Sequence, residues 1–146
     1  MAQEIIGRKQ EIKELLELYK EKKPVFAVVY GRRRVGKTFL VRELFQDKLS
    51  FYHTGLSPYE LKGQKLMEQQ LSSFYSSLIR CGSKAKKIPS NWLEAFDALI
   101  NLLEEQSQDK RQVIFIDELP WMDTAKSGFI PALENFWNSW AVLRND

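Results

Sequence analysis

The sequence contains few of the residues from which disulfide-bonded, metal-binding and membrane proteins are built. Its 146 residues include one cysteine and one histidine. Cys81 therefore cannot form a disulfide bond within the chain, and His53 cannot assemble a histidine metal cluster. No apolar run approaches the roughly 20 residues that span a membrane, and the N-terminus does not resemble a signal peptide. We expect a cytoplasmic protein without a membrane segment.

The chain also lacks a strong excess of charge of either sign. Its formal net charge is +3, and its 44% hydrophobic and 28% charged residues are ordinary for a soluble globular protein. Much of the positive excess is local, because Arg32, Arg33 and Arg34 are consecutive. Composition therefore does not support a nucleic-acid partner, and the length favours one domain or a piece of one.

The most informative feature that is present is a glycine-rich pattern at residues 31–38. It reads G-x-x-x-x-G-K-T, the phosphate-binding loop of P-loop nucleotide-binding proteins. The apolar run 25–30 before it predicts a buried strand, and apolar residues at helical spacing from Leu40 to Phe45 predict a helix after it. A strand, a glycine-rich turn and a helix start form the context in which this pattern binds nucleotide phosphates.

Each part of this loop has a predicted task. The glycines allow backbone N–H groups to approach phosphate oxygens, and the helix N-terminus adds about half a positive charge. We expect Lys37 to neutralise the β- and γ-phosphates of ATP and the Thr38 hydroxyl to bind Mg²⁺. The arginines are individually interpreted as a solvated loop tip whose collective field speeds nucleotide encounter. The predicted nucleotide-binding residues of this segment are Gly31, Arg32, Arg33, Arg34, Val35, Gly36, Lys37, Thr38 and Phe39.

A second part of the site is predicted where the apolar run 113–116 ends in Asp117 and Glu118. The run indicates another buried strand, and ligands of open α/β sheets bind at the carboxyl ends of strands. Asp117 is expected to hold Mg²⁺, the Walker B role. Glu118, facing the opposite side, is expected to orient and deprotonate the attacking water. Because strands commonly end in charged residues, this interpretation depends on the intact phosphate loop.

Apolar spacing and capping residues predict the remaining elements. An amphipathic helix is expected over 9–23 and a short β-prone run over 50–54. Further helices are expected from Ser57, from Ser90 and from near Pro131. Strands that alternate with helices imply an α/β fold with a parallel sheet.

Other residues with chemical potential have ordinary interpretations. His53, at the end of the second strand, is most simply a polar residue at a sheet edge, although it lies on the rim of the predicted site. Cys81, beside a helix-capping glycine, is interpreted as structural. Trp121 follows the 113–116 strand closely and either lines the site or meets a partner. The tryptophans on helical core faces are Trp92, Trp137 and Trp140.

These motifs resemble the prokaryotic ATPases of the archaeal-type AAA/STAND group. The resemblance is carried by residues 5–8 (I-I-G-R), by the loop at 31–38 and by residues 115–123 (F-I-D-E-L-P-W-M-D), and it covers nearly the whole chain. It implies a three-layer P-loop NTPase core of the ASCE type with a parallel sheet, often followed by a winged-helix and a nuclease-like region. The opening segment of such ATPases packs near the adenine. The base-pocket candidates are therefore Ile6, Gly7 and Arg8.

The family pattern continues beyond Asp146 with a strand that carries a polar sensor residue and a helical region that carries an arginine. We therefore expect residues 1–146 to be the N-terminal part of a single P-loop ATPase domain, incomplete at the C-terminus, with full turnover dependent on the missing part. In ASCE folds the sensor strand separates the 25–30 strand from the 113–116 strand. Its absence would expose strand edges, which predicts self-association.

Two alternatives to an ATP-hydrolysing switch remain open at this stage. A P-loop small-molecule kinase would need an acceptor pocket and an arginine-rich lid, neither of which the sequence shows, and the adjacent carboxylates suit water activation better. A non-catalytic nucleotide-binding fragment would act mainly in assembly. Radiolabelled ATP separates hydrolysis from transfer to an acceptor.

Overall fold

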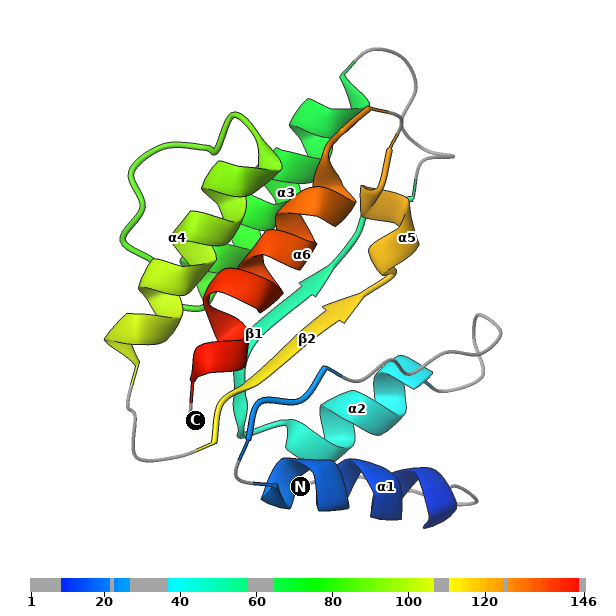
Figure 1. Ribbon diagram of the computed structural model, residues 1–146. Helices are drawn as coiled ribbons and strands as arrows, with labels where there is room; N and C mark the ends of the chain where they lie inside the picture. Colours follow the sequence, from blue (N-terminus) through cyan, green and yellow to red (C-terminus); the bar gives the residue numbers. More distant parts are fainter. Residues whose placement is uncertain are drawn as a thin grey trace.

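The computed structural model describes residues 9–21, 23–26, 37–57, 65–106, 111–124 and 126–144. Within them, helices alternate with strands along the chain (Figure 1). The helices and strands are, in order, α1 (Lys9–Lys20), α2 (Lys37–Phe45), β1 (Leu49–Thr54), α3 (Leu66–Arg80), α4 (Trp92–Glu105), β2 (Val113–Asp117), α5 (Leu119–Met122), α6 (Phe129–Ser139) and the 3₁₀ turn η1 (Ala141–Leu143).

The two strands form a parallel pair, which confirms the α/β prediction. Thr54 is aligned with Asp117, so both strands end at the same edge of the sheet. The connection from β1 to β2 passes through α3 and α4, as a parallel pair requires a long crossover. A register shift between Leu49 and Phe51 interrupts the pairing at the start of β1.

Different helices cover the two faces of this sheet. α3, α4 and α6 lie on one face, and α2 lies on the other with α1 beyond it (Figure 1). Because side chains alternate along a strand, Phe51 of β1 points toward α3 and packs on Phe74 with ring centroids 5.2 Å apart. Tyr52 points toward α2, where it contacts Phe115 at 5.5 Å and lies under the Arg42 guanidinium.

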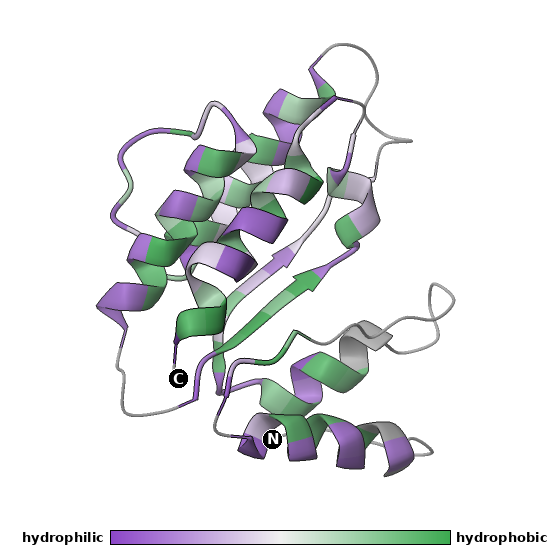
Figure 2. Cartoon of the chain, viewed as in Figure 1, coloured by the Kyte–Doolittle hydropathy of each residue, from purple (hydrophilic) through white to green (hydrophobic). Residues whose placement is uncertain are grey.

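The core on the α3 side is rich in aromatic rings. Phe74 is fully buried and lies between Phe51, His53, Trp92 and Phe96, with ring centroids 5.0 to 5.8 Å away. Figure 2, coloured by hydropathy, shows apolar residues along β2 and polar residues on the outer sides of α1 and α4. Of the tryptophans expected in the core, Trp92 is 1% exposed, whereas Trp137 and Trp140 are half-buried.

Helix ends follow local capping chemistry. α4 begins one residue later than expected, because the Asn91 side chain accepts the Glu94 N–H at 2.8 Å while Ser90 binds the Glu94 carboxylate. α3 ends with Gly82 at φ 105°, the left-handed conformation that glycine adopts without strain. The helix start expected at Ser57 falls largely on residues 58–64, outside the described residues.

The structure describes little of the strand expected at 25–30, and it shows the strand expected at 113–116 less buried than predicted. Residues 27–30 lie outside the described residues, and Val25 and Phe26 are not in a strand. In β2 the side chains of 113–116 are only half-buried. Within the described part of the chain, β2 pairs with β1 alone. No described helix is both long and apolar enough to cross a membrane.

Candidate functional site

The candidate site lies at the edge where both strands end. Asp117, the last residue of β2, is 4% exposed. Alternation along β2 places it on the same face as Phe115, the face that α2 covers. α2 runs opposite to the strands, so its first residue, Lys37, lies toward the edge at which they end (Figure 1). The predicted Walker B carboxylate and the helix after the phosphate loop therefore belong to one side of the sheet.

The phosphate loop itself is described only in part. Lys37, Thr38 and Phe39 form the first turn of α2. Residues 31–36, which include Gly31, Arg32, Arg33, Arg34, Val35 and Gly36, lie outside the described residues, as do Ile6, Gly7 and Arg8. Their nucleotide-binding roles, and those of the side chains at 37–39, stay predictions.

Backbone hydrogen bonds fix Asp117 between the two strand ends. The N–H of Gly55 donates to the carbonyl oxygen of Asp117 at 2.9 Å. The N–H of Glu118 donates to the Asp117 side chain at Oδ1, also at 2.9 Å. No group of three potential metal-ligating side chains occurs among the described residues. A single carboxylate suits Mg²⁺, which keeps several waters and takes one or two carboxylates together with phosphate oxygens.

Glu118 occupies an unusual backbone conformation. Its φ of 55° and ψ of 40° are left-handed, in the turn between β2 and α5. A residue other than glycine in this region costs of order 1 kcal/mol or more and persists only when its surroundings impose it. One such constraint is the bond from the Trp121 N–H to the Glu118 carbonyl oxygen at 3.0 Å. The half-buried Trp121 thus belongs to the turn beside the candidate site.

The Glu118 turn is also constrained by Gly55. A Cβ at position 55 would lie 2.7 Å from the carbonyl oxygen of Glu118 and 3.1 Å from Cγ of Met122. Real Cβ atoms do not approach a backbone oxygen this closely, so glycine is required for the contact. Gly55 directly follows the β-prone run predicted at 50–54; its role at the site depends on β1 and β2 being neighbours, which the sequence did not show.

His53 is not on the rim of the site. Its side chain is 1% exposed and points to the α3 side, with Nδ1 2.7 Å from Ser77 Oγ. Its Nε2 has no hydrogen-bond partner among the described residues. Burial, with a smaller contribution from the Arg80 charge, lowers the pKa of His53 to about 4. The interpretation of His53 as a polar residue at the sheet edge, on the rim of the predicted site, was therefore wrong. Its side chain points to the α3 face of the sheet, whereas the candidate site lies on the α2 face.

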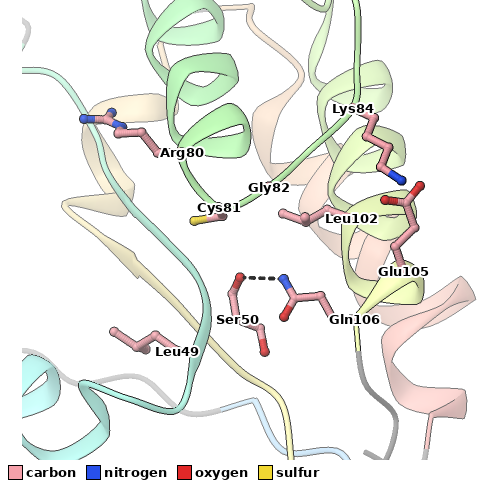
Figure 3. Close-up of a pocket in the computed structure, with 9 residues that line it drawn as sticks. All are labelled: Leu49, Ser50, Arg80, Cys81, Gly82, Lys84, Leu102, Glu105 and Gln106. Atoms are coloured by element: carbon pink, nitrogen blue, oxygen red, sulfur yellow. Dashed lines mark hydrogen bonds between the residues drawn. The ribbon is translucent and has the colours of Figure 1, made fainter.

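A separate hollow lies at the other end of the sheet (Figure 3). Its volume is about 510 Å³, and it is lined where β1 begins, by Leu49 and Ser50, and where α3 ends, by Arg80 and Cys81. The Gln106 side chain donates to the Ser50 carbonyl oxygen across it at 3.1 Å. It contains none of the predicted nucleotide-binding residues, and the ligand site of a parallel sheet lies at the carboxyl ends of the strands.

Comparison with known proteins agrees with the motifs. The model of a family described as an ATPase domain predominantly from Archaea matches residues 5–140. A protein of Methanocaldococcus jannaschii named "uncharacterized ATP-binding protein" is 40% identical over 43 residues, 30% of this chain and 73% of that protein. No solved structure matches. Since the family model spans the loop, both strands and most of the helices, the chain belongs to this family of archaeal-type ATPase domains.

Proposed function

We propose that this chain binds Mg-ATP and serves as the nucleotide-hydrolysing switch domain of an AAA/STAND-like ATPase. The observation that carries the proposal is the position of Asp117, buried at the carboxyl end of β2 on the face covered by α2. The family match and the name of the archaeal relative support ATP binding. The helix that begins at Lys37 directly follows the phosphate-loop pattern.

The proposed roles divide between holding charge and moving a proton. Lys37 and the N–H groups of residues 31–38 bind the phosphates, where the positive end of α2 favours negative charge. Thr38 and Asp117 hold Mg²⁺, which when bound offsets the charge that develops on the transferred phosphoryl group. Glu118 orients the attacking water and accepts its proton. Within this proposal, Ile6, Gly7 and Arg8 contact the adenine.

The proposal includes an architecture of which the described residues form a part. Helices on both faces of a parallel β1–β2 pair are compatible with the three-layer P-loop core. We infer that residues 1–146 are the N-terminal part of one such domain and that a further strand pairs with the edge of β2 opposite β1. Kinase activity has no described acceptor pocket beside Asp117 to support it.

ATP binding is tested with the phosphate-loop lysine. Lys37→Ala should weaken Mg-ATP binding at least about tenfold, which corresponds to roughly 1.4 kcal/mol for the loss of a charge-assisted phosphate contact. Isothermal titration calorimetry measures both affinities. Lys86→Ala, which removes an exposed lysine from the loop before α4, is the matched control and should bind ATP as the parent does. Equal affinities for the Lys37 variant and the parent would refute the phosphate-loop assignment.

A further inference from the structure

Gln70 is a fully buried polar side chain in the second turn of α3, beside the candidate site. It is 0% exposed. Its Oε1 accepts the N–H of Leu56 at 3.1 Å, and its Nε2 donates to the carbonyl oxygens of Leu56 at 2.8 Å and Trp121 at 3.1 Å. Both amide hydrogens and the amide oxygen are therefore used, and all three partners are backbone groups.

These partners come from the two loops that follow the strands. Leu56 comes directly after Gly55 at the end of β1, and Trp121 belongs to α5, which follows Glu118 and β2. The hydrogen bonds from the Gln70 side chain to Leu56 give the backbone partners beyond the last residue of β1. The bond to Trp121 fixes α5 to the same side chain. Gln70 thus joins the segments on either side of the contact between Gly55 and Glu118.

A merely space-filling role would favour an apolar residue at this position. Burying an amide costs free energy unless its hydrogen bonds are replaced, and a leucine or methionine would fill the same volume without that cost. The buried amide instead replaces the hydrogen bonds that it would make with water by bonds to three backbone groups of Leu56 and Trp121. The arrangement holds a turn in which Glu118 adopts the left-handed conformation.

We propose that Gln70 is a positioning residue for Glu118: its carboxamide ties the loop after β1 to the turn after β2 and thereby sets where the Glu118 carboxylate stands. The chemical part of this proposal rests on the ATPase function proposed above. Gln70 does not touch the reacting atoms; it acts through the backbone of residues 118–121. Displacement of a catalytic group by about 1 Å can cost up to a hundredfold in rate.

Gln70→Glu is the informative variant because it keeps the size of the side chain. Its carboxylate accepts the Leu56 N–H but cannot donate to the carbonyl oxygens of Leu56 and Trp121. Gln70→Met removes all three bonds without adding charge. Gln69→Glu, at the exposed neighbouring position of α3, makes the same charge change and is the matched control. Thermal unfolding establishes that each variant is folded.

Two measurements on the full chain test the proposal separately. Amide NMR without nucleotide should show the signals of Glu118 and Trp121 shifted in both Gln70 variants and unchanged in Gln69→Glu. Unshifted signals in a folded Gln70 variant would overturn the positioning role. This measurement depends on no activity, so it decides the role of Gln70 even if the parent fails to bind ATP, a result that would refute only the proposed function.

The kinetic measurement tests whether the position of the Glu118 carboxylate affects the rate of ATP hydrolysis. In a chain that also carries the rest of the ATPase domain, Gln70→Glu should lower kcat for ATP hydrolysis roughly tenfold or more while KM changes little, because the phosphate loop is untouched. In a Glu118→Gln background the same change should have no further effect, since the group being positioned is gone. An equal additional loss in that background would mean that Gln70 acts on general structure and not through Glu118.

Discussion

At the scale of single residues, the two adjacent carboxylates of the β2 end are held in different ways. Asp117 is the buried last residue of a strand, with its side chain accepting a backbone N–H. Glu118 is half-buried and lies outside the strand, in a left-handed turn. A group that holds a cation benefits from a fixed position, whereas a group that accepts a proton must reach water. The local backbone therefore suits the two roles that we propose.

The first residue-scale prediction separates these roles. In a chain that also carries the rest of the ATPase domain, Glu118→Gln should leave Mg-ATP binding nearly unchanged and lower turnover by about a hundredfold or more, because the amide cannot accept the proton of water. Asp117→Asn should instead weaken the Mg²⁺-dependent part of ATP binding. Calorimetry and phosphate release measure the two effects. Glu68→Gln, on an exposed position of α3, is the control, and turnover of Glu118→Gln at the parent rate would assign Glu118 a structural role.

The sequence pointed to the candidate carboxylates of this site but not to the residues that support them. Asp117 and Glu118 were identifiable because a carboxylate pair after an apolar run carries a local pattern. Gly55 and Gln70 were not, because their partners are distant in the sequence and a single glycine or glutamine has no local signal. His53 was misplaced for the same reason: alternation along β1 decides which way it points, and only the packing of α3 shows which face is the core.

At the scale of elements, β1 is fixed to α3 by polar as well as apolar contacts. The hydrogen bond between His53 and Ser77 lies within a cluster of rings that includes Phe51 and Phe74. Arg80, one turn further along α3, donates to the same Ser77 oxygen at 3.4 Å. A protonated His53 would place a second positive charge near Arg80 in a buried position, so the neutral ring is the form that the packing favours.

This packing predicts a dependence of stability on pH. The pKa of His53 is lowered to about 4 in the folded chain, whereas an unfolded histidine has a pKa of about 6.5. The unfolded chain therefore binds the proton more readily than the folded chain. The contribution of the neutral His53 to the stability of the fold is complete above about pH 6.5 and is lost as the pH falls toward 4. Between pH 6.5 and pH 5 we expect a loss of roughly 2 kcal/mol in the free energy of unfolding.

Urea unfolding at a series of pH values measures this effect. His53→Gln is the comparison, because glutamine can hydrogen-bond to Ser77 but does not titrate. The parent should lose stability between pH 6.5 and 5 more steeply than the variant, since the carboxylates that also titrate in this range are common to both. Parallel curves for the two proteins would show that the buried histidine does not take up the proton on unfolding.

At the scale of the whole molecule, helices cover both faces of the sheet, and the edge of β2 that faces away from β1 is the one to consider for association with another chain. β2 has no second strand beside it within the described residues. Near this edge Phe26 is 52% exposed, although its ring contacts Trp137 of α6 with centroids 5.6 Å apart. Apolar side chains that remain exposed beside a sheet edge favour association with another chain.

We therefore predict that the chain self-associates in solution, as the sequence also suggested. Sedimentation velocity over a range of concentrations should show species larger than the monomer. Phe26→Glu should shift the distribution toward monomer by placing a charge beside the edge. Leu93→Glu, at a similarly exposed position on α4, should not. A monodisperse monomer at all concentrations would contradict the prediction.

The alignment of Thr54 with Asp117 also has a consequence for how the chain folds. The two halves of the candidate site are contributed by segments on opposite sides of a long crossover, so no local hairpin can assemble it. Contacts between residues distant in the chain form slowly, because the entropy of closing the intervening loop is lost before they form. The carboxylate edge of the sheet is therefore complete only once the crossover is in place.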